Sequence, residues 1–366
     1  MATRDQSQRV VSSEDRDSLT QLFPAITQDI FDMKPDSPKE VRSQFKPIAT
    51  SASGIEICEH LPQMAKWMQK AAIVRTVNHK AGRHNTLPSY TGHEVLLPDV
   101  TNTKNSYPSS MGSMCEYLRA TDESGQGELP DYVYVPCYLS WGQNIRCPCP
   151  YGGFLGKRFD ALTTERDPFK AKGTPNVVPG SPQTALGPPR LADSRLPEDI
   201  TLDRLNTRRG LLKKFDDELR RIDRSGSIET FSRQKQKAFE ILGGSDLKTA
   251  FELDSGKPEL IDRYGRTLFS NSTLIRRRLV ERGVRFVNVT WDLFWDRVKL
   301  DYDAWDTHTK NFPILRDNKL PGMDKTYSTL MEDLAARGFL DETLVVVMSK
   351  MGRTPRINGE DLAEGD

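Results

Sequence analysis

The fold is decided by two apolar runs and the helix between them. The runs are Val284-Arg285-Phe286-Val287-Asn288-Val289 and Thr343-Leu344-Val345-Val346-Val347-Met348, both rich in the β-branched residues that favour buried strands. Between them, the apolar spacing of residues 323–337, followed by Gly338, predicts a helix. A strand, crossover helix and strand unit normally makes its two strands parallel neighbours with a right-handed crossover. The stretch therefore predicts an α/β fold with a mostly parallel sheet and helices on both faces.

Similar patterns extend this unit toward the start of the chain. The expected elements are helices over residues 61–70, 205–222 and 267–281, and strands over residues 71–77 and 132–135. Gly283 is expected to end the helix over residues 267–281. The basic run Arg276-Arg277-Arg278 falls inside that helix near Glu281 and has no interleaved aromatic residues. We interpret it as a solvated helix face rather than a nucleic-acid patch.

Two segments do not fit this pattern. Residues 1–28 are polar and are predicted to be a tail, so the single α/β domain is expected to cover residues 29–366. Residues 136–197 are rich in Pro, Gly and Thr and are too long for an ordinary connection. We interpret them as an insertion, either a functional excursion over the surface or a mobile segment.

The composition excludes several classes of partner. A chain of 366 residues, 36% of them hydrophobic, can bury a sizeable core. Its 52 basic and 51 acidic side chains leave a net charge of +1, which gives no long-range field to attract nucleic acid or an anionic membrane. No run approaches the roughly 20 apolar residues that cross a bilayer, and residues 1–6 lack the apolar core of a signal peptide. We expect a cytoplasmic protein with no nucleic-acid or membrane partner, and the oligomeric state is left open.

The cysteine count also favours a cytoplasmic location. An odd number of cysteines in a long chain argues against a disulfide framework and favours a reducing compartment. The run Cys147-Pro148-Cys149-Pro150 has no CxxC partner, so it is more typical of a proline-stiffened loop than of part of a zinc site.

A candidate metal site lies in Trp305-Asp306-Thr307-His308. In an extended segment, residues i and i+2 point to the same side, so Asp306 and His308 can converge on one ion. Mixed oxygen and imidazole ligands suit zinc or manganese. In an alternative interpretation, Asp306 accepts backbone hydrogen bonds and orients His308 within the loop. Loops 78–93, 291–312 and 349–357 are all expected at the carboxyl ends of strands, where parallel sheets bind ligands.

Six motifs occur in order between residues 29 and 355. They are Asp29-Ile30-Phe31-Asp32-Met33-Lys34-Pro35, Phe45-Lys46-Pro47-Ile48, Ile57-Cys58-Glu59-His60-Leu61-Pro62, Arg278-Leu279-Val280-Glu281-Arg282-Gly283-Val284-Arg285-Phe286-Val287, Trp305-Asp306-Thr307-His308 with Asn311-Phe312, and Gly352-Arg353-Thr354-Pro355. In these motifs the chain resembles the bacterial family catalogued as domain of unknown function 1501. That family is similar in fold to alkaline phosphatases and sulfatases, so the resemblance implies an alkaline phosphatase-like sheet with a metal site at the strand ends.

The resemblance also implies roles for particular residues. The positions that correspond to metal-site residues are Asp29, His84, Asp306 and His308. Asn85 and Thr86 lie in the region where the wider superfamily has its nucleophile. Arg353 could hold a phosphate or sulfate oxygen through its planar fork, or it could equally pin its own turn by bonding carbonyls.

The chain departs from the family pattern near the expected site. Family members usually carry an apolar strand and a Gly-Gly-Pro-Ser-His run where this chain has Phe23-Pro24-Ala25-Ile26-Thr27-Gln28, so one strand and one ligand are expected to be missing. Lys350-Met351 stands where the family commonly has Glu-Phe, and Arg83 stands at a position that is often acidic. No histidine follows His308, so the family's later Asp-His pair has no counterpart. The fold is therefore expected to be incomplete at its C-terminal end, or the gene boundary to be misplaced.

These observations lead to two functional hypotheses. In the first, the protein is a metal-dependent hydrolase of phosphate or sulfate esters, with Thr86 as nucleophile and Asn85 and Arg353 binding a small anionic ester. Because the chain has five histidines in total, a single ion is expected rather than a complete two-ion site. In the second hypothesis, the protein is a catalytically inactive relative that acts as a binding or assembly module. Lys350, the missing Asp-His pair and the expected loss of the leading strand favour this alternative.

Overall fold

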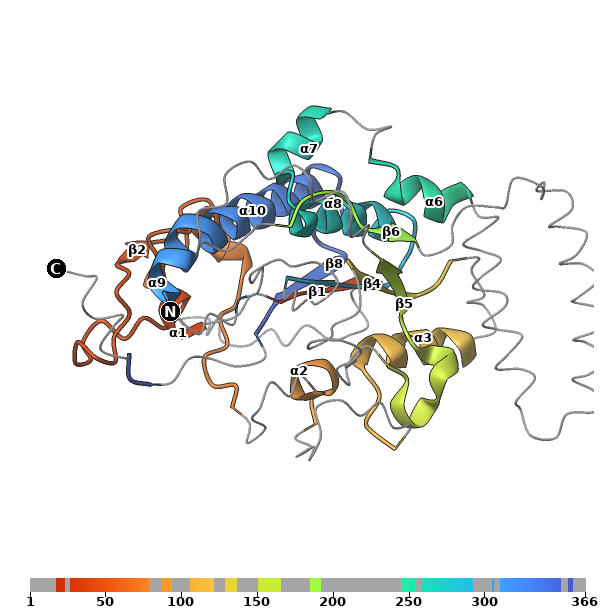
Figure 1. The fold of residues 1–366 in the computed structure, drawn as a ribbon, viewed down its shortest axis with the longest axis horizontal. Helices are drawn as coiled ribbons and strands as arrows, with labels where there is room; N and C mark the ends of the chain where they lie inside the picture. Colours follow the sequence, from red (N-terminus) through yellow and green to blue (C-terminus); the bar gives the residue numbers. More distant parts are fainter. Residues whose placement is uncertain are drawn as a thin grey trace, which may run out of the picture.

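A six-stranded sheet forms the centre of the molecule (Figure 1). The computed structural model describes residues 18–23, 27–78, 87–93, 106–121, 129–136, 151–165, 185–191, 245–253, 258–291, 305, 310–349 and 355–357. The strands, in spatial order, are β6 (Arg190–Leu191), β5 (Leu162–Glu165), β4 (Tyr132–Val135), β7 (Phe286–Thr290), β1 (Ser18–Phe23) and β8 (Thr343–Val347). All neighbouring pairs are parallel except β5 and β6. The predicted α/β class with a mostly parallel sheet is confirmed.

Helices cover both faces of this sheet, as the sequence predicts (Figure 1). On one face lie α7 (Pro258–Tyr264), α8 (Leu268–Val280) and α10 (Leu320–Ala336), with α6 (Ser245–Phe251) beside α8. On the other face lie α2 (Leu87–Thr91) and α3 (Met111–Thr121). The remaining elements are α1 (Thr27–Ile30), β2 (Pro47–Ala49), β3 (Glu56–Cys58), the 3-10 helices η2 (Met64–Lys70), η3 (Gly153–Leu155) and η4 (Lys157–Phe159), α9 (Asn311–Ile314) and the π-helix η6 (Leu315–Lys319).

Local chemistry explains where the two long helices begin and end. The side chain of Thr267 accepts a hydrogen bond from the backbone N–H of Ser270 at 3.1 Å and so caps the start of α8. Gly283 follows α8 and Gly338 follows α10, both with the positive φ that glycine adopts without strain. The helices predicted over residues 267–281 and 323–337 are confirmed within a few residues.

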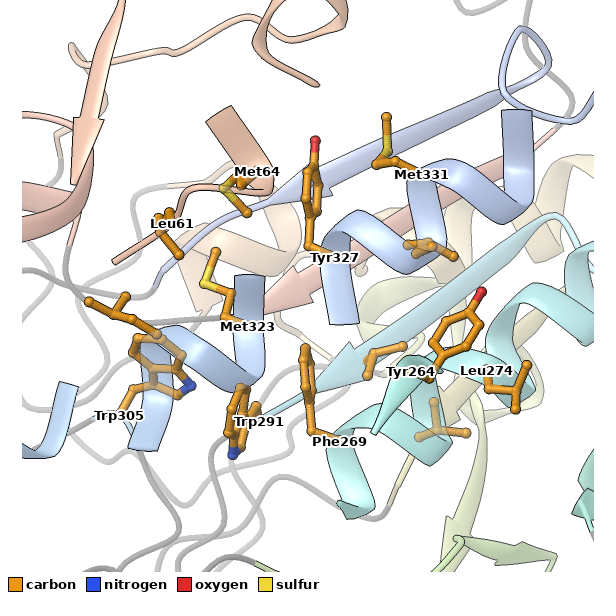
Figure 2. Packing of buried hydrophobic residues seen from close by; sticks show 14 of the residues in the cluster. Leu61, Met64, Tyr264, Phe269, Leu274, Trp291, Trp305, Met323, Tyr327 and Met331 are labelled. Carbon is orange, nitrogen blue, oxygen red and sulfur yellow. The ribbon is translucent and has the colours of Figure 1, made fainter. Parts of the chain in front are cut away.

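The two faces of the central strands differ in their side chains. In β4 and β7, four valines (Val133, Val135, Val287 and Val289) belong to the main core, together with apolar residues of α8 and α10. Figure 2 shows this core, where Met323 and Tyr327 of α10 lie over Phe269 of α8. Because successive residues of a strand face opposite sides, Tyr134 and Asn288 belong to the face that α2 and α3 cover. Burial on both faces fits a strand in the middle of a parallel sheet.

The predicted polar tail is wrong for residues 18–23. These residues form β1, which pairs in parallel with β7 on one side and with β8 on the other. The strand expected to be missing before the Asp-x-Phe-Asp motif is therefore present. It also separates the two strands that the sequence predicts to be neighbours, since β7 and β8 are parallel but do not pair. The polar residues Thr20 and Gln21 weaken the local pattern, and pairing on both sides of β1 overrides it.

The strand predicted over residues 71–77 is also wrong. These residues form no strand, and the Val74 and Val77 side chains are 67% and 74% exposed. A β-branched run becomes a strand only where a partner edge is available. The helix predicted over residues 61–70 is confirmed in a tighter form, as the 3-10 helix η2. Its start is held by Asp324, whose carboxylate accepts hydrogen bonds from the backbone N–H groups of Gln63 and Met64.

Two strands lie within the described parts of residues 136–197. β5 pairs in parallel with β4, and β6 pairs with β5, so residues 162–165 and 190–191 belong to the sheet rather than to an insertion. The 3-10 helices η3 and η4, between β4 and β5 in the chain, lie outside the sheet and contact α3. Strands of four and two residues are too short to give a periodic signal. The helix predicted over residues 205–222 and the run Cys147-Pro148-Cys149-Pro150 lie outside the described residues. Cys58 and Cys115 are free thiols.

The basic run in α8 is not a solvated face. Arg276 and Arg277 are buried. Arg277 pairs with Glu281 and, at 2.8 Å, with Asp333 of α10, while Arg337 pairs with Asp333 at 2.9 Å and with Glu281 at 2.7 Å. The Tyr264 hydroxyl donates a hydrogen bond to Asp333 at 3.1 Å. We call Tyr264, Arg277, Glu281, Asp333 and Arg337 the charge cluster. It joins α7, α8 and α10, so the basic side chain of Arg277 meets its acidic partners inside the protein.

Candidate functional site

The carboxyl ends of the parallel strands define one edge of the sheet. β1 ends at Phe23, β4 at Val135, β7 at Thr290 and β8 at Val347, and all four run in the same direction. Sheets of this kind bind ligands beyond their carboxyl ends, because the loops and helix ends converge there. We therefore looked for the site among the segments that leave this edge.

Asp29 lies in α1, a few residues beyond the end of β1. Its residue is fully buried, and its backbone carbonyl accepts a hydrogen bond from the Ser43 hydroxyl at 3.4 Å. The Cys58 thiol lies close by. Burial raises the pKa of Cys58 to about 12, and the negative charge of Asp29 is a smaller cause in the same direction. The Cys58 thiol is therefore neutral at pH 7 in the metal-free protein.

The other predicted site residues lie outside the described part of the chain. They are His84, Asn85, Thr86, Asp306, His308 and Arg353, together with Lys350. Within the described residues, no three His, Cys, Asp or Glu side chains gather as a metal site needs. The structure therefore describes Asp29 alone among the predicted ligands, and it leaves the predicted grouping open.

The described residues next to these positions in the sequence lie at or near the carboxyl edge. α2 begins at Leu87, directly after Thr86, and its Ser89 hydroxyl donates to the carbonyl of Ser349, just after β8, at 3.4 Å. Beyond β8, the backbone N–H of Ile357 donates to the carbonyl of Glu40 at 2.8 Å, which joins this segment to the one that follows α1. The loop predicted over residues 78–93 follows no strand, and its described end, residues 87–91, is the helix α2 near this edge.

A group of packed aromatic side chains lies near the same edge, on the side of α8 and α10 (Figure 2). Trp291 follows β7, stacks on Phe269 at 4.3 Å between ring centroids, and meets Trp305 edge to face at 5.3 Å. Lys319 ends the short π-helix η6, and its ammonium lies 4.9 Å from the centre of the Trp291 ring. Short π-helical segments within helices are frequent at functional sites. Trp305, the residue before Asp306, is thereby held in the core.

A buried polar group lies on the opposite face. The hydroxyls of Tyr90 and Tyr134 are 2.8 Å apart, and the Asn288 side-chain N–H donates to the Tyr90 hydroxyl at 3.5 Å. All three residues are at least 98% buried. We call them the polar row. Sequence reasoning missed the polar row and Lys319. The one available signal was an asparagine in the middle of a valine-rich strand.

The fold and the segments that gather at the carboxyl edge of the sheet define an α/β protein with a mainly parallel sheet and a candidate site at the carboxyl ends of its strands. A sequence model of the family described as protein of unknown function (DUF1501) matches residues 26–365, and the chain therefore belongs to that family. The family membership inferred from the six motifs is confirmed. Searches of curated proteins and of solved structures gave no match. None of the helices in the described ranges has the length and apolar character needed to cross a membrane.

Proposed function

We propose that this protein is a metal-dependent hydrolase of phosphate or sulfate esters, with an alkaline phosphatase-like fold and its site at the carboxyl edge of the sheet. One observation carries the proposal. Segments from distant parts of the chain lead to this edge: α1 with Asp29, α2 directly after Thr86, and Trp305 directly before Asp306. The parallel strand order supports the same location.

The proposed donors suit a divalent cation. Asp29 and Asp306 would supply carboxylate oxygens, and His84 and His308 would supply imidazole nitrogens, a set that fits zinc or manganese. A bound ion of this kind supplies Lewis-acid stabilisation of negative charge on the ester oxygens.

The residues around the ion would divide the remaining work. The Thr86 hydroxyl would attack the phosphorus or sulfur atom as the bond to the leaving alcohol breaks, and its proton would pass to that leaving oxygen. Water would then hydrolyse the threonine ester, which releases phosphate or sulfate and restores the Thr86 hydroxyl. The Asn85 amide would donate a hydrogen bond to an ester oxygen, and the Arg353 fork would bind two oxygens at once. These roles account for a polar loop leading into α2 and an arginine beyond β8.

Metal content and turnover test this proposal together. We expect the purified protein to retain about one zinc or manganese per chain by elemental analysis, and Asp306→Ala to lose most of it. With added metal, we expect hydrolysis of generic phosphate or sulfate esters. Substoichiometric zinc, manganese, magnesium and calcium that Asp306→Ala leaves unchanged would remove the proposal.

A second candidate function is a catalytically inactive relative that acts as a binding or assembly module. Lys350 favours it, because a cation stands where the family commonly places a glutamate near the expected ion. The ester assay separates the two candidates. Reproducible turnover that His308→Ala abolishes excludes the inactive protein, whereas a metal-loaded wild type without turnover supports it.

A further inference from the structure

The polar row is unusual for its position in the sheet. β7 lies between β4 and β1, and its neighbouring residues Val287 and Val289 belong to the apolar core. In a strand buried on both faces, an amide costs free energy unless it is fully hydrogen-bonded. Among the described residues, the side-chain oxygen of Asn288 has no hydrogen-bond partner, and its N–H contact at 3.5 Å is long. The row is therefore not explained by stability alone.

The contacts of the polar row converge on α2. This helix has five residues, far fewer than the ~12 an isolated helix needs to be stable in water. Tertiary contacts must therefore hold it. On the sheet side they include the hydroxyl contact of Tyr90 with Tyr134 of β4, the Asn288 contact from β7, and the bond from Ser89 to Ser349 after β8. Two strands and the segment after a third thus contact one short helix.

We propose that Tyr90 is a positioning residue. Its hydroxyl, held by Tyr134 and Asn288, fixes α2 against the sheet and so fixes Leu87, the residue that follows Thr86 in the sequence. The catalytic part of this inference rests on the proposed function, because Thr86 is the nucleophile proposed there. The anchoring of α2 stands independently of any reaction.

The test compares two tyrosines that each lose one buried hydroxyl. Tyr90→Phe removes the hydroxyl contact but keeps the ring, whose centroid lies 6.2 Å from that of Tyr134. Tyr264→Phe is the matched control, because its hydroxyl donates to Asp333 on the opposite face of the sheet. Hydrogen exchange of the full chain, read in peptides over residues 79–93, reports the anchoring. Kinetics on a phosphate or sulfate ester report the catalytic effect.

We expect Tyr90→Phe to speed exchange in α2 by about tenfold, while Tyr264→Phe leaves it unchanged. For the ester, we expect kcat of Tyr90→Phe to fall about tenfold or more with KM within about twofold, and Tyr264→Phe to match the wild type. Unchanged α2 exchange, or an equal fall in kcat for both variants, would overturn the inference.

If the wild type shows neither metal nor turnover, the proposed function fails. Exchange over residues 79–93 then decides whether Tyr90 anchors α2.

Discussion

Two polar groups on opposite faces of the same sheet, both centred on buried side chains, differ in how they are bonded. In the charge cluster, Arg277 and Arg337 each pair with Glu281 and Asp333 at ion-pair distance. In the polar row, the Asn288 oxygen has no hydrogen-bond partner among the described residues. The charge cluster joins helices to one another, whereas the polar row joins a short helix to the strands.

This difference separates a structural role from a functional one. A buried charge that is held in ion pairs loses much stability when one partner is removed, because the other charge is left uncompensated. A buried group that is incompletely bonded contributes little to stability, and its retention points to another use. The polar row also lies close to the carboxyl ends of β4, β7 and β8, where the candidate site is expected.

Removing the central carboxylate of the charge cluster should have the largest effect. Asp333→Ala leaves Arg277 buried without one of its acidic partners, so we expect unfolding in urea to show a loss of about 3–5 kcal/mol. Glu332→Ala is the control, because its pair with Arg263 is half exposed and should change stability by about 0.5 kcal/mol or less. Similar losses for both variants would show that burial of the cluster does not matter.

A buried carboxylate at the start of β4 gives an intermediate, pH-dependent effect. Asp131 pairs with Arg119 at 2.8 Å, yet burial outweighs that charge and raises the pKa of Asp131 from 3.8 to about 6. Between pH 4 and pH 6 the folded protein holds a proton that the unfolded chain releases, so this group's contribution falls as pH rises. We expect the wild type to lose about 2 kcal/mol relative to Asp131→Asn over this window. A constant difference in urea unfolding across the window would contradict the raised pKa.

Replacing the amide of the polar row should have the smallest effect on stability. Asn288→Val matches the flanking valines and removes the incompletely bonded amide, so we expect the free energy of unfolding to stay within about 1 kcal/mol or to rise. The reciprocal change, Val287→Asn, places an amide in the apolar core and should cost about 3 kcal/mol. If Asn288→Val cost as much as Val287→Asn, the polar row would be a stability element and the comparison would fail.

Several elements follow from the sequence because their signals are local. Residues 132–135 and the helix after Thr267 carry dense apolar patterns with clear ends, and both form as predicted. β1 does not follow from its own six residues, because its order depends on pairing with β7 and β8 from the far end of the chain. Buried Arg277 of α8 was misread for the same reason, since its acidic partner Asp333 lies on another helix.

The candidate site was predictable only in part. Asp29 came from a motif resemblance, and the structure places it in α1, just beyond the end of β1. The polar row was not predictable, because Tyr90, Tyr134 and Asn288 come from three separate elements and carry no shared spacing. Long-range pairing of this kind is visible only once the strand order is known.

The most direct test of the account is an anomalous difference map, at the zinc edge, of crystals grown with zinc. We expect one strong peak at the carboxyl edge of the sheet, with the Asp29 carboxylate and the His308 imidazole about 2.0–2.2 Å from the ion. A map without a peak at that edge, or with Asp29 and His308 on opposite sides of the sheet, would contradict the proposed site.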